Sequence, residues 1–382
     1  MKHDVRYIEM VGKFILRALK RNPFIISDEI LYRLLSGKIV NLPYPPRELA
    51  ISITGACTNR CLFCVHHSLD AKKDPAVNKL YNLPYRLSYV DFTKIVDIAY
   101  ESRVPKIHIV ASGEAFTHKD ILKMIDYTIN VYDKLSLFTN FHKGLFEKHN
   151  YINEIIHRGG HISTICTDIL SYYPTIHESI KLGSNYEYLL NSLEKISRST
   201  DIHFSIMYIY TKQNYKDVHK LVELLHNKCV NFDFNIISLD PYNFNEFTSL
   251  SNAYTSDIND MTNELNILKD KCKELQINLN VANPIDIPPA KKEELFWKQI
   301  HFSPSRDVPE YQWNGNAYIR LCMGVVKGDL SSLGYLYDYN SLMDFWNNEK
   351  YKKIRKNMIK GIYPSNQCKY CYQCPENLFA KR

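Results

Sequence analysis

From about residue 48 the sequence alternates short β-rich runs with amphipathic helical runs, and this alternation limits the possible folds more than any other feature. The β-rich runs are apolar on both faces, as strands buried inside a parallel sheet are. Strands that alternate with helices are typical of a parallel α/β sheet. The six candidate strands are ELAISIT, KIHIVA, KLSLFT, HISTIC, IHFSIMYI and NFDFNIIS.

Between these strands lie helical patterns such as SYVDFTKIVDIAYE, KDILKMIDYTIN, NYEYLLNSLEKIS and NYKDVHKLVELLHN. Ser88, followed three residues later by Asp91, resembles a capping box at the start of the first helix. Residues 48–238 therefore predict an α/β barrel or an open partial barrel, of the partial (β/α)6 TIM-like kind. In such a fold the chemistry lies at the carboxyl ends of the strands.

The pattern changes on both sides of this region. Residues 1–47 predict a helical N-terminal segment, and residues 239–309 a helical linker region with one short strand, INLNVA. Residues 310–382 predict a small cysteine-rich C-terminal domain. We expect no transmembrane segment, because no apolar run is long enough to span a bilayer.

The charge distribution predicts the class of partner, and the cysteine content predicts the cellular compartment. The net charge of +7 is spread along the chain, and no basic block alternates with aromatic residues, so we expect no nucleic-acid partner. A small substrate that is anionic or sugar-like is compatible with this charge. Ten cysteines without an export signal indicate a reducing, cytoplasmic location. In such a compartment clustered thiols serve as metal ligands more often than they form disulfides.

Three cysteines lie close together in ITGACTNRCLFCVHHS, on the loop that follows the first strand. Thiolates suit zinc, copper or iron–sulfur clusters, but a structural zinc site uses four protein ligands. Cys57, Cys61 and Cys64 supply only three. Three thiolates on a cubane of four irons leave one iron open, and we favour this interpretation. The following pair, His66 and His67, is expected to be exposed to solvent.

The spacing Cys57-x-x-x-Cys61-x-Phe63-Cys64 resembles the signature of the radical S-adenosylmethionine (SAM) enzymes, including the aromatic residue before the last cysteine. The resemblance implies that the three thiolates hold a 4Fe–4S cluster whose fourth iron is chelated by SAM. One electron then cleaves SAM to methionine and a 5′-deoxyadenosyl radical, which abstracts a hydrogen atom from a substrate.

Three further strand ends are similar to motifs of the same family. Ser112-Gly113-Glu114 resembles its Gly-Gly-Glu-Pro motif, which implies that Glu114 accepts a hydrogen bond from the SAM amino group and that Gly113 lets the backbone approach. Thr139-Asn140 resembles a Thr-Asn-Gly end, with Phe141 where glycine is common. Cys166-Thr167-Asp168 resembles a Ser-x-Asp-Gly end. The residues expected to bind the cofactor are Phe63, Ser112, Gly113, Glu114, Asn140 and Asp168.

Cys166 has two interpretations. Strand alternation places it on one face with Asp168, so it lies near the radical if that face is the barrel interior. It is either a buried, inert cysteine or a catalytic hydrogen-atom donor that quenches a substrate radical, as an epimerase requires.

A second group of cysteines lies near the end of the chain. A zinc knuckle or an auxiliary iron–sulfur cluster could use the same four thiols. The surrounding sequence, with Arg320-Leu321 before the first cysteine and a Phe345-Trp346-Asn347 helix, resembles the SPASM extension or its shorter relative Twitch. This resemblance favours one auxiliary 4Fe–4S cluster, with the ligands Cys322, Cys368, Cys371 and Cys374.

The resemblance implies an oxidoreductase supplied by a flavodoxin- or ferredoxin-type electron donor. We expect dehydrogenation of a small-molecule alcohol, such as a sugar or cyclitol, with the auxiliary cluster as electron acceptor. Epimerisation through Cys166 and modification of a peptide or protein remain open alternatives. A non-enzymatic iron–sulfur carrier would leave the Ser-Gly-Glu stretch without a purpose.

Overall fold

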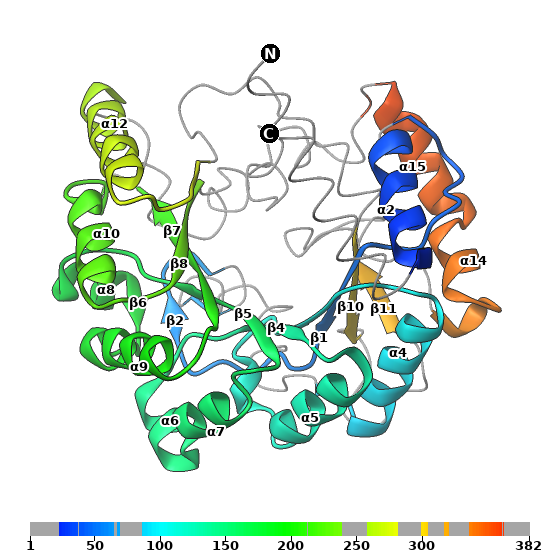
Figure 1. Cartoon of the computed structure of the whole chain (residues 1–382), viewed down its shortest axis with the longest axis horizontal. Coiled ribbons are helices and arrows are strands. Elements are labelled where there is room, and N and C mark those ends of the chain that lie inside the picture. Colours follow the sequence, from blue (N-terminus) through cyan, green and yellow to red (C-terminus); the bar gives the residue numbers. More distant parts are fainter. Residues whose placement is uncertain are drawn as a thin grey trace.

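One curved sheet forms the centre of the protein, and helices cover its outer side (Figure 1). The computed structural model describes residues 23–36, 38–64, 67–68, 86–211, 213–238, 258–281, 299–304, 317–320, 336–360 and 362. The sheet has nine strands in the order β11-β10-β1-β3-β4-β5-β7-β8-β9. Their bounds are β1 Glu48–Ser52, β3 Ile107–Val110, β4 Leu135–Phe138, β5 Ile162–Asp168, β7 His203–Tyr210, β8 Phe232–Ser238, β9 Leu279–Val281, β10 Gln299–Pro304 and β11 Ala317–Arg320.

The strands from β1 to β9 in this order run parallel, which confirms the predicted parallel α/β sheet. All six predicted strands are present, as β1, β3, β4, β5, β7 and β8. The sheet also continues past residue 238, because the short predicted strand INLNVA contains β9, which pairs with β8. At the opposite edge β10 pairs in parallel with β1, and β11 pairs antiparallel with β10.

Two very short strands form a separate ladder. β2, Arg60–Cys61, pairs antiparallel with β6, Lys181–Leu182. This ladder connects the loop after β1 to the segment after β5.

The predicted helices are present between the strands. Ser88 caps α4 as expected, because its hydroxyl accepts a hydrogen bond from the Asp91 amide at 3.1 Å. The helices are α2 Pro23–Leu35, α4 Tyr89–Glu101, α5 Ile121–Tyr132, α6 Lys143–His149, α7 Tyr151–His157, α8 Pro174–Ile180, α9 Tyr186–Ser199, α10 Val218–Asn227, α12 Ile258–Glu274, α14 Leu342–Trp346 and α15 Glu349–Ile359, with 3₁₀ turns at Ala115–Thr117 and Leu336–Asp338.

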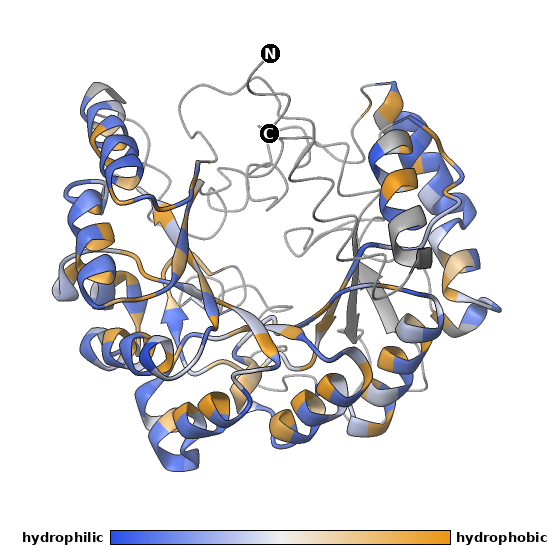
Figure 2. Ribbon diagram, in the orientation of Figure 1, coloured by the Kyte–Doolittle hydropathy of each residue, from blue (hydrophilic) through white to orange (hydrophobic). Residues whose placement is uncertain are grey.

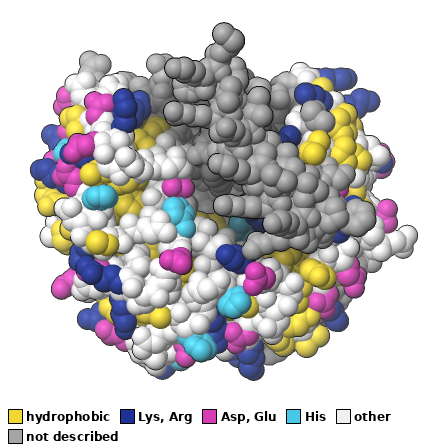
Figure 3. Space-filling model, viewed as in Figure 1, with side chains coloured by type: hydrophobic (Ala, Val, Ile, Leu, Met, Phe, Trp, Pro, Cys, Tyr) yellow, Lys and Arg dark blue, Asp and Glu magenta, His cyan; other side chains and the backbone are white. Residues whose placement is uncertain are grey.

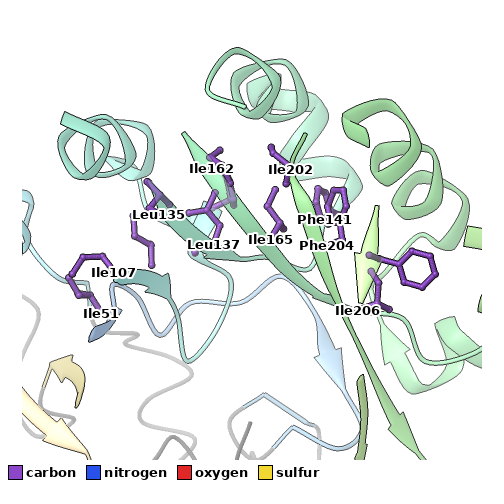
Figure 4. Packing of buried hydrophobic residues seen from close by; sticks show 14 of the residues in the cluster. Ile51, Ile107, Leu135, Leu137, Phe141, Ile162, Ile165, Ile202, Phe204 and Ile206 are labelled. Atoms are coloured by element: carbon purple, nitrogen blue, oxygen red, sulfur yellow. The ribbon is translucent and has the colours of Figure 1, made fainter. Parts of the chain in front are cut away.

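The hydrophobic core lies between the sheet and these helices. Figure 4 shows Leu137, Ile165 and Phe204 in this layer, and each is fully buried. In Figure 2 the helices carry both hydrophobic and hydrophilic residues, as expected where one face packs on a sheet and the other meets water. In β5 the buried Ile165 and Thr167 alternate with Cys166 and Asp168. The latter two therefore share the opposite, inner face of the curved sheet.

The outer surface has no single dominant charge on the side shown in Figure 3, where basic and acidic side chains are interspersed. Among the helices that the structure describes, none is both long enough and apolar enough to cross a membrane.

Candidate functional site

The three-cysteine loop begins directly after β1, at the carboxyl end of the sheet. The β2–β6 ladder holds its middle, where Cys61 lies opposite Lys181. The Leu62 amide adds a hydrogen bond to the Ile180 carbonyl at 2.9 Å, and the Cys64 amide donates to the Cys61 carbonyl at 3.0 Å. The loop is therefore fixed in place by backbone contacts on both sides of Cys61.

The thiols of this loop lie close enough to influence one another. Burial and, to a smaller extent, the neighbouring Cys64 raise the pKa of Cys57 to about 12, while a hydrogen bond from the Asn59 amide opposes this shift. Burial and then the Asp168 carboxylate raise the pKa of Cys61 well above its usual value. These thiols stay protonated at neutral pH unless a cationic metal group displaces the protons.

The three thiols of the loop are compatible with an iron–sulfur cluster. Within the described ranges, no three His, Cys, Asp or Glu side chains converge closely enough to hold one ion. In a 4Fe–4S cubane each thiolate binds a different iron, so the three sulfurs need not meet at one point. Three thiols on one fixed loop match this requirement.

The Ser112-Gly113-Glu114 stretch follows β3 and packs against the cysteine loop. A Cβ atom on Gly113 would lie 1.9 Å from the Ala56 carbonyl oxygen, which is impossible without movement of the backbone. The Glu114 amide donates to the same oxygen at 2.7 Å. Glycine is thus required here because the cysteine loop occupies the space that a side chain would need.

The Glu114 carboxyl group is only 1% exposed, and three donors surround it. Its Oε1 accepts from the Phe116 amide at 3.0 Å and the Thr139 hydroxyl at 2.9 Å. Its Oε2 accepts from the Asn140 amide at 2.6 Å. Burial raises the pKa of Glu114, while these hydrogen bonds favour the carboxylate. A buried carboxylate that keeps acceptor capacity fits the α-ammonium group of SAM.

Asn140 connects this carboxyl group to the cysteine loop. Its side-chain Nδ2 lies 3.9 Å from Cys57 Sγ and 3.4 Å from Thr58 Oγ1. The next residue, Phe141, has a φ of 52° and is buried. The left-handed backbone explains why glycine is common at this place in similar sequences, and the buried ring shows how this chain uses phenylalanine instead.

At the end of β5, Asp168 pairs with a buried lysine that the sequence analysis missed. Lys181 Nζ lies 2.9 Å from Asp168 Oδ1 and 3.1 Å from the Asp168 carbonyl oxygen. The lysine side chain is 1% exposed. No sequence signal indicated this burial, because a lysine at the end of a helix is usually exposed.

Cys166 lies two residues before Asp168 on the same face of β5. Burial raises the pKa of its thiol to about 12, opposed by a hydrogen bond with the Ser205 side chain. Asn235 Nδ2 donates to Ser205 Oγ at 3.0 Å, and Asn280 Nδ2 donates to Asn235 Oδ1 at 2.9 Å. A row of polar side chains thus crosses β5, β7, β8 and β9.

The structure brings most of the expected site residues together on one edge of the sheet. Phe63 lies half-buried within the cysteine loop, and the Ser112 carbonyl oxygen lies 3.1 Å from His67 Nε2. The expectation that His67 is exposed was wrong: it is 5% exposed and contacts this carbonyl oxygen. His66 and the four predicted auxiliary ligands Cys322, Cys368, Cys371 and Cys374 lie outside the described residues. Thr139, which binds Glu114, was also missed.

Comparison with known proteins agrees with this geometry. Residues 51–225 match the family model described as the radical SAM superfamily. No curated protein sequence matches the chain.

Similar solved structures include SuiB of Streptococcus suis bound to the precursor peptide SuiA, with 16% identity and a TM-score of 0.59 over 98% of this chain and 83% of that one. Another is anSMEcpe with bound AdoMet and the Cp18Cys peptide, with 12% identity and a TM-score of 0.53 over 86% of this chain and 88% of that one. At these identities the likeness concerns the fold. The family match, in turn, identifies residues 51–225 as a radical SAM domain.

Proposed function

We propose that this protein is a radical SAM oxidoreductase in which Cys57, Cys61 and Cys64 hold the SAM-binding 4Fe–4S cluster. When bound, this cluster supplies the electron that cleaves SAM and so generates the radical that abstracts a substrate hydrogen. The observation that carries the proposal is the buried Glu114 carboxyl group next to the cysteine loop, connected to it through Asn140.

The residues of the chain would bind and orient the cofactor. Glu114 accepts a hydrogen bond from the SAM ammonium group, since a cation offsets the unfavourable burial of the carboxylate. The contact between Gly113 and Ala56 keeps the Glu114 loop and the cysteine loop in a fixed relation. Phe63, Ser112, Asn140 and Asp168 complete the proposed pocket.

The proposed reaction is the dehydrogenation of an alcohol. The substrate carbon would lose a hydrogen atom and its hydroxyl group a proton, and a second 4Fe–4S cluster would supply the acceptor for the remaining electron. We propose that residues 310–382 provide this auxiliary cluster through Cys322, Cys368, Cys371 and Cys374, on the basis of their sequence pattern. A flavodoxin- or ferredoxin-type protein would supply the first electron.

Two alternatives each have one supporting observation. Peptide modification is supported by the two solved structures of similar fold that contain bound peptides. Epimerisation is supported by the inward-facing, protonated Cys166, which would return a hydrogen atom to the substrate radical.

The test is an anaerobic incubation of reconstituted protein with SAM, dithionite and either cell metabolites or peptides. We expect 5′-deoxyadenosine together with a product that has lost two hydrogens. A product of unchanged mass in ordinary water that carries one deuterium after incubation in deuterated water would instead show epimerisation. Cys61→Ala should abolish deoxyadenosine formation, whereas Cys229→Ala, at an exposed site away from the cysteine loop, should retain it. A wild-type protein that holds iron but releases no methionine from SAM would contradict the proposal.

A further inference from the structure

Lys181 occupies an unusual place for a lysine, directly beside a proposed cluster ligand. It is the residue opposite Cys61 in the antiparallel β2–β6 ladder. Side chains that are directly opposite in such a ladder lie on the same face, with Cβ atoms about 5 Å apart. The Lys181 side chain is 1% exposed, so water screens its charge very little.

Asp168 is the ion-pair partner of this buried ammonium group. Lys181 Nζ donates to two oxygens of Asp168, the carboxylate Oδ1 at 2.9 Å and the carbonyl oxygen at 3.1 Å. Because Asp168 contacts Lys181 directly, its negative charge is held beside the residue that is opposite Cys61. One positive and one negative group therefore face the same ligand from β6 and β5.

We propose that the Lys181–Asp168 ion pair sets the reduction potential of the cluster held at Cys57, Cys61 and Cys64, with Lys181 raising it and Asp168 lowering it. The inference rests on the proposed function only in assuming that a cluster binds at these cysteines. Reduction adds one negative charge to a group that is already bound by three thiolates. A buried cation nearby favours that added charge, and a buried anion opposes it, because the net charge around a cluster is among the factors that fix its potential.

The experiment uses the full chain, reconstituted anaerobically, with the Lys181→Met and Lys181→Arg variants. The fraction of reduced cluster is followed by EPR at a series of applied potentials without SAM, so that any contact between Lys181 and SAM has no effect. SAM added at the end identifies the signal of the SAM-binding cluster, since only that signal changes. We expect Lys181→Met to lower the ratio of reduced to oxidised cluster at a fixed potential by about tenfold, or about 59 mV for one electron.

Lys181→Arg retains the charge and should stay close to the wild-type potential. The matched control is Lys228→Met, which removes a lysine from another ion pair of similar length, 2.7 Å to Glu194, between α10 and α9 on the outer side. This control should leave the potential unchanged.

Asp168→Asn separates an electrostatic role from a structural one. It should raise the potential, opposite to Lys181→Met, whereas a general loosening of the site would reduce the iron content of both variants. If Lys181→Met does not retain iron, the potential of Asp168→Asn tests the inference by itself. Unchanged potentials, or shifts in the same direction, in variants with wild-type iron content would overturn the inference. A wild-type protein that binds no iron would instead overturn the proposed function.

Discussion

At the scale of single residues, the contact between Gly113 and Ala56 leaves no space for even one added methyl group. The Cα atom of Gly113 packs on the Ala56 carbonyl, directly before Cys57. The Glu114 amide binds the same carbonyl oxygen. The position of the carboxyl group and that of the first cysteine are thus set by one shared backbone contact.

We therefore predict that Gly113→Ala lowers the free energy of unfolding by about 3 kcal/mol, since overpacking against rigid backbone is destabilising. The same variant should hold less iron after reconstitution, because the cysteine loop must move. Gly160→Ala is the matched control, since a Cβ there has no neighbour within 4 Å, and its effect should stay within about 0.5 kcal/mol. Urea unfolding and iron analysis check both. Equal effects at the two glycines would contradict the interpretation.

A second prediction at this scale concerns Cys166. If the protein oxidises its substrate, Cys166→Ala should leave product formation largely intact, because the thiol takes no part in the reaction. If it is an epimerase, the same variant should still make 5′-deoxyadenosine but no epimer, because the hydrogen donor is missing. Mass spectrometry of products formed in deuterated water distinguishes the two. A variant that makes no deoxyadenosine would show that Cys166 is needed for SAM cleavage. That result would contradict both interpretations of Cys166, as an inert thiol and as a hydrogen-atom donor.

At the scale of elements, β7 and β8 carry an ion pair that depends on pH. His203 Nε2 lies 3.3 Å from Asp233 Oδ2, and this carboxylate raises the pKa of His203 above its ordinary value of 6.5. The pair therefore stabilises the folded state most below that value, and the contribution is lost as the pH rises through the raised pKa of the folded protein.

We predict that the stability advantage of the wild type over His203→Gln is larger at about pH 6 than at about pH 8.5. Urea unfolding at the two pH values measures the difference. Asp233→Asn should remove the same pH dependence, because it removes the cause of the raised pKa. Parallel stability profiles of wild type and His203→Gln would refute the assignment.

The elements also differ in how far the sequence predicts them. The long strands and helices follow from hydrophobic periodicity, and Ser88 and Asp91 marked the start of α4 correctly. The two-residue strands β2 and β6 have no period, since each contains only one alternation, so their pairing exists only through the tertiary fold. Sequence motifs likewise predicted Glu114 and Asn140 as site residues. The contacts that Lys181 and Thr139 make with site carboxylates follow only from the tertiary structure.

At the scale of the whole molecule, Arg355 of α15 holds together parts of the chain that are far apart in sequence. It is fully buried, and its Nη1 donates to the Val40 carbonyl at 3.1 Å and to Asn347 Oδ1 at 3.2 Å. Its guanidinium carbon also lies 4.3 Å from the centre of the Trp346 ring. The helices near the end of the chain are thereby attached to the segment that leads into β1.

We predict that Arg355→Met lowers the free energy of unfolding by about 2–4 kcal/mol, because the part-buried Val40 carbonyl and Asn347 side-chain oxygens each lose a donor and the Trp346 ring loses its cation. Arg198→Met is the control: its side chain is 60% exposed and its ion pair with Glu194 lies on one helix, so the loss should stay below about 1 kcal/mol. Chemical denaturation of the two variants gives the comparison. A loss as small for Arg355 as for Arg198 would rule out this role.

The backbone pairing of Arg60 and Cys61 with Lys181 and Leu182 has a consequence for anyone who wishes to copy the proposed iron-binding segment. A synthetic peptide spanning residues 53–68 would contain all three thiols but would lack the partner strand, located more than a hundred positions downstream, that gives the segment its shape. Such a peptide should therefore capture iron loosely and in several arrangements. A miniature catalyst built from this protein would need both pieces, joined in the antiparallel register seen here.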